Sequence, residues 1–200
     1  MPRRTLVILN TQAARAARTW PIIEKLFAHH KFDFELHQTT HAGDAESRTR
    51  EALRAGYAII AVVGGDGTLS EVASGFFSTP NGDGELPLRV SETAAMAVLP
   101  SGTGNDFARG LLKRRASLDD WINRLINYSR QGATSEARLL DVLYGSVDAG
   151  AKNFICLNAA TLGIGAEVAT LVAAQNNFTQ RLFGEVRFGI AALHGARALA

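Results

Sequence analysis

A continuous apolar run followed by a glycine-rich turn restricts the possible folds of this chain most strongly. Tyr57–Val63 reads YAIIAVV, and Gly64–Thr68 reads GGDGT. A run that is apolar at every position is typical of a strand buried on both faces of a parallel sheet, whereas a half-exposed strand alternates. Thr68–Phe77 then has the composition of a helix. A buried strand that passes through a tight turn into a helix predicts α/β architecture.

The same alternation recurs along the first two thirds of the chain. Further strands are predicted at Thr5–Asn10, Phe32–Leu36 and Ala94–Leu99, and further helices at Ala13–His30, Gly43–Ala55, Thr103–Leu112 and Leu118–Arg130. Pro21 leaves open whether the first helix begins near Ala13 or at the proline itself. Strands that alternate with helices predict a parallel sheet covered on both faces, which is a three-layer α/β domain.

The pattern changes near residue 137. Two segments with strand composition, Arg138–Val147 and Asn153–Leu162, are joined by the turn signal Asp148-Ala149-Gly150, and no helix separates them. We therefore expect a hairpin and a domain boundary, with a first domain at 1–136 and a second, β-rich domain at 137–200. Because the sequence stops at residue 200 without a polar tail, we expect it to be a fragment of a longer protein.

Composition excludes several classes of protein. The chain is 46% hydrophobic and 20% charged, which is ordinary for a globular protein, and its net charge of +2 gives no reason to expect nucleic acid as a partner. The single cysteine, Cys156, cannot form an internal disulfide and is consistent with a reducing compartment. No apolar run reaches the roughly 18 residues needed to span a bilayer. We expect a cytoplasmic protein, with peripheral membrane contact left open.

The GGDGT turn has the chemistry of a phosphate site. Glycines allow the backbone to approach an anion closely, and the N–H groups of the turn and of the following helix attract it. Asp66 lies among them and suits a magnesium ion; the alternative is a plain turn with Asp66 as a helix cap. A Walker loop is excluded because the sequence contains no Gly-Lys, and a dinucleotide fingerprint would need glycine at Ser70.

A second glycine loop follows the predicted strand Ala94–Leu99. Residues 99–109 read LPSGTGNDFAR, which supplies a hydroxyl at Thr103 and directional polar groups at Asn105 and Asp106. Taken alone, this segment also fits a well-capped turn. Because the carboxyl ends of parallel strands meet at one edge, both loops should gather there with Asn10 and Thr40.

Together the two motifs resemble the diacylglycerol kinase catalytic domain family, which includes bacterial lipid kinases and sphingosine kinases. The first motif alone is shared with NAD kinases, but an NAD kinase should also have an Asn-Glu pair, and this sequence contains none. Asn153–Glu167 resembles the beginning of the family's second domain. The resemblance implies an NAD kinase/diacylglycerol kinase-like first domain followed by the start of a β-sandwich. It also implies an ATP-dependent lipid kinase that transfers the γ-phosphoryl group to a lipid hydroxyl such as that of diacylglycerol.

The resemblance further assigns roles to residues that match the family's motifs. ATP and Mg²⁺ are the implied cofactors, and Asp66 is both the catalytic residue and the residue placed for the metal. The residues implied to bind the nucleotide are Asn10, Thr40, Gly64, Gly65, Asp66, Gly67, Thr68, Gly102 and Thr103, and those near the acceptor are Asn105 and Asp106. The implied partner is a lipid presented at the inner face of a membrane. The resemblance leaves open whether two copies of the chain form a homodimer.

Two departures from the family pattern limit these expectations. After Asn10 the family continues with proline and later glycine, whereas Thr11–Ala14 reads TQAA, which weakens the case for a phosphate role of that loop. The general base and further magnesium ligands are implied to lie beyond residue 200, so we expect this chain to bind nucleotide but to turn over poorly. A non-catalytic nucleotide-binding regulatory module stays open as an alternative. His37, His41 and Asp44 straddle a strand-to-helix junction, and we do not expect them to hold a metal.

Overall fold

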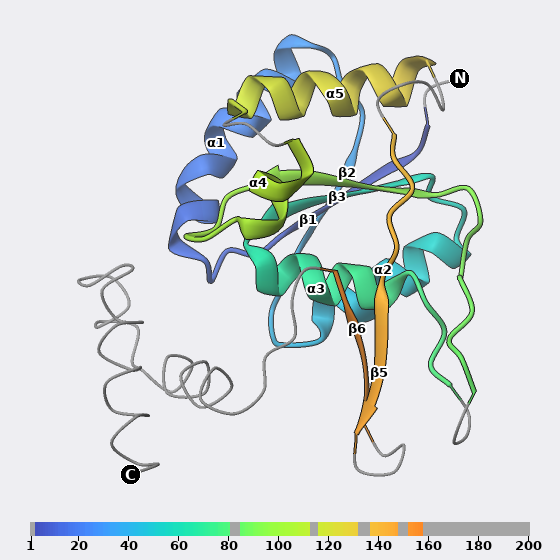
Figure 1. Cartoon of the computed structure of the whole chain (residues 1–200). Coiled ribbons are helices and arrows are strands. Elements are labelled where there is room, and N and C mark those ends of the chain that lie inside the picture. The colour runs from blue at the N-terminus through green and yellow to red at the C-terminus, as the bar shows by residue number, and fades with distance from the viewer. Residues whose placement is uncertain (1–2, 81–84, 113–115, 132–136, 148–151, 158–200) are drawn as a thin grey trace, which may run out of the picture. The chain divides into compact units, whose positions relative to one another are not determined.

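The computed structural model describes residues 3–80, 85–112, 116–131, 137–147 and 152–157 (Figure 1). Its centre is a four-stranded sheet in the order β2-β1-β3-β4. The strands are β1 (Thr5–Leu9), β2 (Glu35–Gln38), β3 (Ile59–Gly64) and β4 (Ala95–Pro100), and each neighbouring pair is parallel. The predicted parallel sheet is therefore confirmed.

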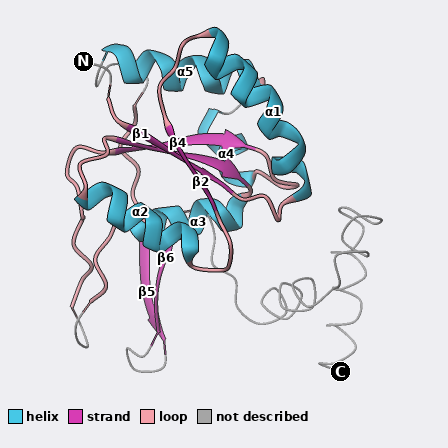
Figure 2. Ribbon diagram, turned by 180° about the vertical axis from the view of Figure 1, so that it is seen from behind, coloured by secondary structure: helices cyan, strands magenta, loops and turns pink. Residues whose placement is uncertain are grey.

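Helices cover both faces of this sheet, as Figures 1 and 2 show from opposite sides. One layer contains α1 (Ala14–His29) and α5 (Leu118–Gln131), and the other contains α2 (Asp44–Arg54) and α3 (Asp66–Gly75). A short helix, α4 (Asp106–Leu112), follows β4. The predicted three-layer α/β arrangement is thus confirmed. No helix in the described ranges is long and apolar enough to cross a bilayer.

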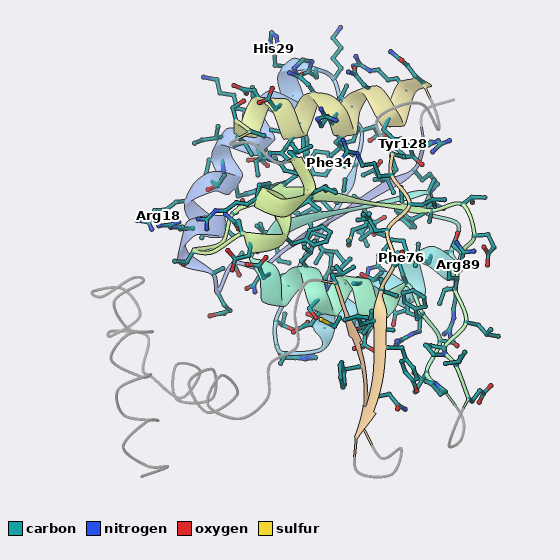
Figure 3. All side chains as sticks on the ribbon, in the orientation of Figure 1. Arg18, His29, Phe34, Phe76, Arg89 and Tyr128 are labelled. Carbon is teal, nitrogen blue, oxygen red and sulfur yellow. The ribbon has the colours of Figure 1, made fainter. Side chains whose placement is uncertain are left out.

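The two inner strands form the core. Every residue of β1 and β3 is buried, as the continuous apolar runs predicted. Ile23 and Phe27 of α1 and Ile122 of α5 pack against one face of the sheet and are almost completely buried. In Figure 3, Phe34 and Tyr128 lie beneath this helical layer, while Arg18 and His29 project outward. Each fully buried aliphatic side chain contributes about 1.5–3 kcal/mol, so the core fixes the strands that carry the loops described below.

The second strand begins later than predicted. The alternation at residues 32–36 predicted a strand there, but β2 starts at Glu35, where pairing with Leu6 of β1 begins. Phe32 and Phe34 instead pack onto Phe27, with ring centroids 4.8 and 5.1 Å from it. Aromatic packing, and not backbone pairing, therefore buries Phe32 and half-buries Phe34.

Pro21 lies inside α1, which begins at Ala14. Proline in a helix interior costs about 3 kcal/mol because it removes one backbone hydrogen bond. It is exposed here, and the burial of Ile23 and Phe27 on the opposite side of the helix compensates for that loss. Tertiary packing therefore decides where this helix begins.

The predicted hairpin is confirmed; its first strand begins later than expected, and residues 158–162 of the predicted second strand lie outside the described residues. β5 (Leu143–Val147) and β6 (Lys152–Cys156) pair antiparallel as a separate two-stranded sheet, and β6 lies against α3 (Figure 1). Phe154 crosses over Gly145, where a Cβ atom would lie only 2.2 Å from its ring. The domain boundary at residue 136 stays a prediction, and the chain after residue 157 lies outside the described residues.

Candidate functional site

Three loops meet at the carboxyl end of the sheet. They follow β1, β3 and β4, and backbone hydrogen bonds join them to neighbouring strands: Asn10 N–H donates to the Val63 carbonyl at 3.1 Å, and Ser101 N–H donates to the Gly64 carbonyl at 2.8 Å. The chain runs from β1 outward to β2 and returns to the other side of β1 as β3. The adjoining ends of β1 and β3 are thus the switch point at which parallel α/β sheets bind ligands.

The two glycine loops are in direct backbone contact. A Cβ atom on Gly102 would lie 2.4 Å from the Cα of Gly65, and one on Gly64 would lie 2.8 Å from the Thr68 side chain. Real Cβ atoms do not approach other atoms so closely, so glycine is required here for loop-to-loop packing. The prediction that the two loops gather at one edge of the sheet is confirmed.

Asp66 connects the loops through its carboxylate. Its Oδ2 accepts a hydrogen bond from the N–H of Asp106 and its Oδ1 accepts one from the N–H of Phe107, both at 3.2 Å. Asp66 stands in the first turn of α3, yet it caps α4. The N-cap residue of α3 is Gly65, which has no side chain with which to cap the helix. The first N–H groups of α3 have no acceptor within their own helix, so α3 presents an open anion-binding terminus.

Asn105 fixes the turn that leads into α4. Its φ is +55°, a left-handed conformation that asparagine tolerates better than most residues. The side chain bonds to both sides of Gly102: Oδ1 accepts from the Gly102 N–H at 2.8 Å, and Nδ2 donates to its carbonyl at 3.1 Å. As a result α4 begins at Asp106 and not at Thr103, where the sequence predicted its start.

Asn10 organises the loop after β1 and ties it to the loop after β3. Its Oδ1 accepts hydrogen bonds from the N–H groups of Gln12 and Ala13, at 3.0 and 3.3 Å. Its Nδ2 donates to Oγ1 of Thr68 at 2.9 Å, and Thr68 is buried. This asparagine therefore shapes a loop that lacks the family's proline and glycine. The nucleotide-binding roles predicted for Asn10 and Thr68 stay predictions.

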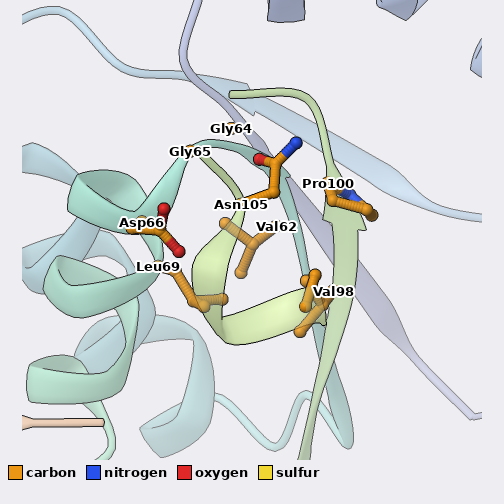
Figure 4. A pocket seen from close by; sticks show the side chains of 9 residues that line it. Val62, Gly64, Gly65, Asp66, Leu69, Val98, Pro100 and Asn105 are labelled. Atoms are coloured by element: carbon orange, nitrogen blue, oxygen red, sulfur yellow. The ribbon is translucent and has the colours of Figure 1, made fainter. Parts of the chain in front are cut away.

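A small hollow lies between the loops (Figure 4). Its volume of about 10 Å³ suits roughly one water molecule. It is lined by Val62, Gly64, Gly65, Asp66, Leu69, Val98, Pro100, Asn105 and Ala108. The hollow is therefore too small to hold a nucleotide. Gly67 is exposed, and a Cβ atom on it would meet nothing within 4 Å.

Two carboxylates flank Gly104. A Cβ atom built on this glycine would lie 3.3 Å from Oδ2 of Asp66 and 3.4 Å from Oδ2 of Asp106. Asp106 is exposed and pairs with Arg109 at 3.3 Å. Magnesium is commonly held by one or two carboxylates together with substrate phosphates, and this pair fits that donor set. Within the described part of the chain, no three His, Cys, Asp or Glu residues form a metal-binding group.

Thr40 lies at the end of β2, beside the end of β1, and is held by Asp44. Oδ2 of Asp44 accepts hydrogen bonds from the Thr40 N–H at 2.7 Å and from its Oγ1 at 3.0 Å, and Oδ1 contacts Nε2 of His37 at 3.1 Å. The Thr40 N–H, above all, lowers the pKa of the Asp44 carboxyl. His41 turns away and contacts the Ala42 carbonyl. Thr40 is thus at the predicted edge but does not line the hollow.

Sequence reasoning missed two residues at this edge. Asp44 was considered only as part of a metal group, although an aspartate beside a turn commonly accepts hydrogen bonds from nearby backbone N–H groups, as Asp44 does from Thr40. Arg15 was not considered at all. Its Nη1 donates to the carbonyls of Gly102 and Thr103, at 3.3 and 3.4 Å, from the first turn of α1. A basic residue at a helix N-terminus, where it opposes the helix dipole, was the available signal.

The model of one protein family matches the part of the chain that forms this site. Residues 4–140 match the diacylglycerol kinase catalytic domain. The chain belongs to the diacylglycerol kinase catalytic domain family. The match covers the whole parallel sheet and all three loops at its carboxyl end, so it includes the residues of the candidate site.

Individual relatives have names that agree with this family. A protein of Pseudomonas fluorescens (strain Pf-5) named "Probable lipid kinase YegS-like" is 32% identical over 170 residues, which is 83% of this chain and 46% of that protein. A diacylglycerol kinase of Staphylococcus carnosus is 35% identical over 113 residues, covering 56% of this chain and 33% of that one. The chain thus spans less than half the length of either relative.

Solved structures of the family include a diacylglycerol kinase from Bacillus anthracis strain Sterne. It is 25% identical to this chain, and the alignment covers 63% of this chain and 40% of that one with a TM-score of 0.44. The family assignment rests on the sequence match and not on this superposition.

Proposed function

We propose that this chain forms the nucleotide-binding part of an ATP-dependent lipid kinase, which transfers the γ-phosphoryl group of ATP to a lipid hydroxyl such as that of diacylglycerol. The uncapped N-terminus of α3 beside two glycine loops carries the proposal. Asp66 caps α4 and not its own helix, so the N–H groups of α3 stay available to phosphate oxygens.

The proposed chemistry is an in-line displacement. The lipid oxygen forms a bond to the γ-phosphorus, the bond from that phosphorus to the β-phosphate oxygen breaks, and ADP leaves. The acceptor's proton passes to a base that the family resemblance places outside this sequence. This chain's own contribution is electrostatic and positional: it binds the phosphates against backbone N–H groups and fixes their orientation.

The carboxylates at the carboxyl end of the sheet are suited to binding magnesium. Asp66, together with Asp106, would hold the ion through the nucleotide's phosphates, and the ion would neutralise charge on the transferred group. Both Asp66 oxygens already accept backbone hydrogen bonds, so we assign Asp66 a positional role as well as this one. Because a lipid acceptor resides in a membrane, we also place the reaction at a membrane surface, reached from the cytoplasm.

The test is a transfer assay with the intact protein. Radiolabelled ATP and Mg²⁺ are incubated with vesicles that contain diacylglycerol, and the lipid phase is extracted and counted. We expect label in phosphatidate, and we expect the label to disappear in Asp66→Asn, which removes the charge at the centre of the site. Label in NADP from added NAD would instead favour an NAD kinase. Binding of ATP with transfer to no acceptor would favour a nucleotide-sensing module.

A further inference from the structure

Arg15 lies where its own helix does not favour it. It is the second residue of α1, and the first turn of this helix contains no acidic residue. A cation at a helix N-terminus opposes the helix dipole. The side chain reaches instead to a loop 87 residues away along the chain, where Nη1 lies 3.3 Å from the Gly102 carbonyl oxygen and 3.4 Å from that of Thr103. Its position is thus explained by the second glycine loop and not by α1.

These contacts determine which way the loop's peptide groups point. Asn105 also binds Gly102, through both its N–H and its carbonyl. The Gly102 and Thr103 carbonyl oxygens are thus turned toward Arg15, in a loop that packs against Gly65 through Gly102. A carbonyl oxygen directed at a phosphate would repel it, so carbonyls engaged by Arg15 favour phosphate binding at this loop.

The guanidinium has further donors for an anion. Arginine carries five N–H groups, and the two contacts above use Nη1 alone. Within the described residues, Nε and Nη2 of Arg15 have no protein acceptor. A planar guanidinium can bind a carbonyl along one side and a phosphate along another, which a lysine ammonium cannot do with the same geometry.

We infer that Arg15 is a positioning residue of the phosphate site: it holds the second glycine loop open to the nucleotide and offers its remaining donors to the terminal phosphates. This inference rests on the proposed function, because it names a residue of the same nucleotide site. It also accounts for how the loop after β1 takes part in the site without the proline and glycine of its family. Arg15, at the start of α1, fixes the second glycine loop, while Asn10 shapes the loop after β1.

Calorimetric titration of this chain with ATP, ADP and adenosine tests the inference. We expect Arg15→Gln to lower the affinity for ATP and ADP about tenfold or more, as the loss of a charged hydrogen bond predicts, and to leave adenosine affinity unchanged. Arg15→Lys, which keeps the charge but not the two-carbonyl geometry, should recover part of the loss. Lys25→Gln is the matched control, since Lys25 is an exposed cation on the same helix.

The outcomes separate this inference from the proposed function. If the wild-type chain binds no nucleotide, the proposed function fails, and the role of Arg15 fails with it. If the wild type binds ATP and both Arg15 variants bind it equally well, only the inference about Arg15 fails. An equal loss of ATP and adenosine binding in Arg15→Gln, with thermal stability unchanged, would also overturn it, because the residue would then not act on the phosphates.

Discussion

The carboxylate of Asp66 accepts a hydrogen bond from the N–H of Phe107, 41 residues further along the chain, at 3.2 Å. This contact joins the start of α3 to the start of α4. A residue that sequence motifs suggest for metal binding thus also holds two loops in register. Its removal should therefore affect folding as well as nucleotide binding.

We expect Asp66→Ala to lower the free energy of unfolding by about 1 kcal/mol, the usual effect of losing a helix cap. Asp66→Asn keeps an acceptor oxygen and should lose less. Urea denaturation measures both values, with the exposed Asp33→Ala as the control. Equal stability of Asp66→Ala and wild type would show that the contact to Phe107 does not stabilise the protein.

Gly102→Ala should separate the two glycine loops. The new Cβ atom would lie 2.4 Å from the Cα of Gly65, and backbone atoms cannot rotate away as a side chain does. We expect nucleotide affinity to fall at least about tenfold and the protein to lose about 1–3 kcal/mol of stability, as overpacking does.

Gly110→Ala is the matched control for that substitution. Gly110 lies in α4, and a Cβ atom there would meet nothing within 4 Å. Alanine should stabilise this helix by up to about 1 kcal/mol and leave ATP binding unchanged. Calorimetry and thermal melts of both variants check the pair. If Gly102→Ala bound ATP as wild type does, close contact of the loops would not matter for the site.

Thr68→Val should leave the Asn10 side chain with an unsatisfied donor. Thr68 is buried, and its hydroxyl oxygen accepts from Asn10 Nδ2 at 2.9 Å. Because Asn10 is half-buried, we expect the loss of an ordinary hydrogen bond, about 0.5–1.5 kcal/mol of stability. Thr68→Ser keeps the hydroxyl and should retain most of the stability in urea denaturation. The opposite order of the two variants would argue against this hydrogen bond.

The pH dependence of stability should include a contribution from Asp44. The Thr40 N–H lowers the pKa of this carboxyl below its ordinary value of 3.8. The ionised form is favoured in the folded state, so its contribution is fully present above about pH 4 and is lost as pH falls through the lowered pKa.

Asp44→Asn tests this contribution by thermal melts between pH 7 and pH 2.5. We expect the variant to melt about 2–4 °C below wild type at pH 7, as a loss of about 1 kcal/mol implies for a protein of this size. The difference should shrink below pH 4. A difference that stays constant over this range would show that ionisation of Asp44 is not its origin.

The sequence alone was sufficient for the layout of the first domain. Buried parallel strands are apolar at every position, so Tyr57–Val63 identified β3, and the turn signal at 148–150 placed the hairpin. The two glycine motifs could also be recognised from the sequence, because a position that has no room for a side chain accepts only glycine. Both are local properties of a few consecutive residues.

The tertiary structure alone decided how the site is held together. Asp66 caps α4 and not α3, Asn10 bonds to Thr68, and Arg15 reaches Gly102; each of these pairs is at least 40 residues apart in the chain. Sequence patterns report the backbone conformation of neighbouring residues, but a side-chain hydrogen bond depends on which loops the fold brings within about 3 Å. For the same reason the alternation at residues 32–36 was visible in the sequence, while the packing of Phe32 and Phe34 against Phe27 was visible only in the structure.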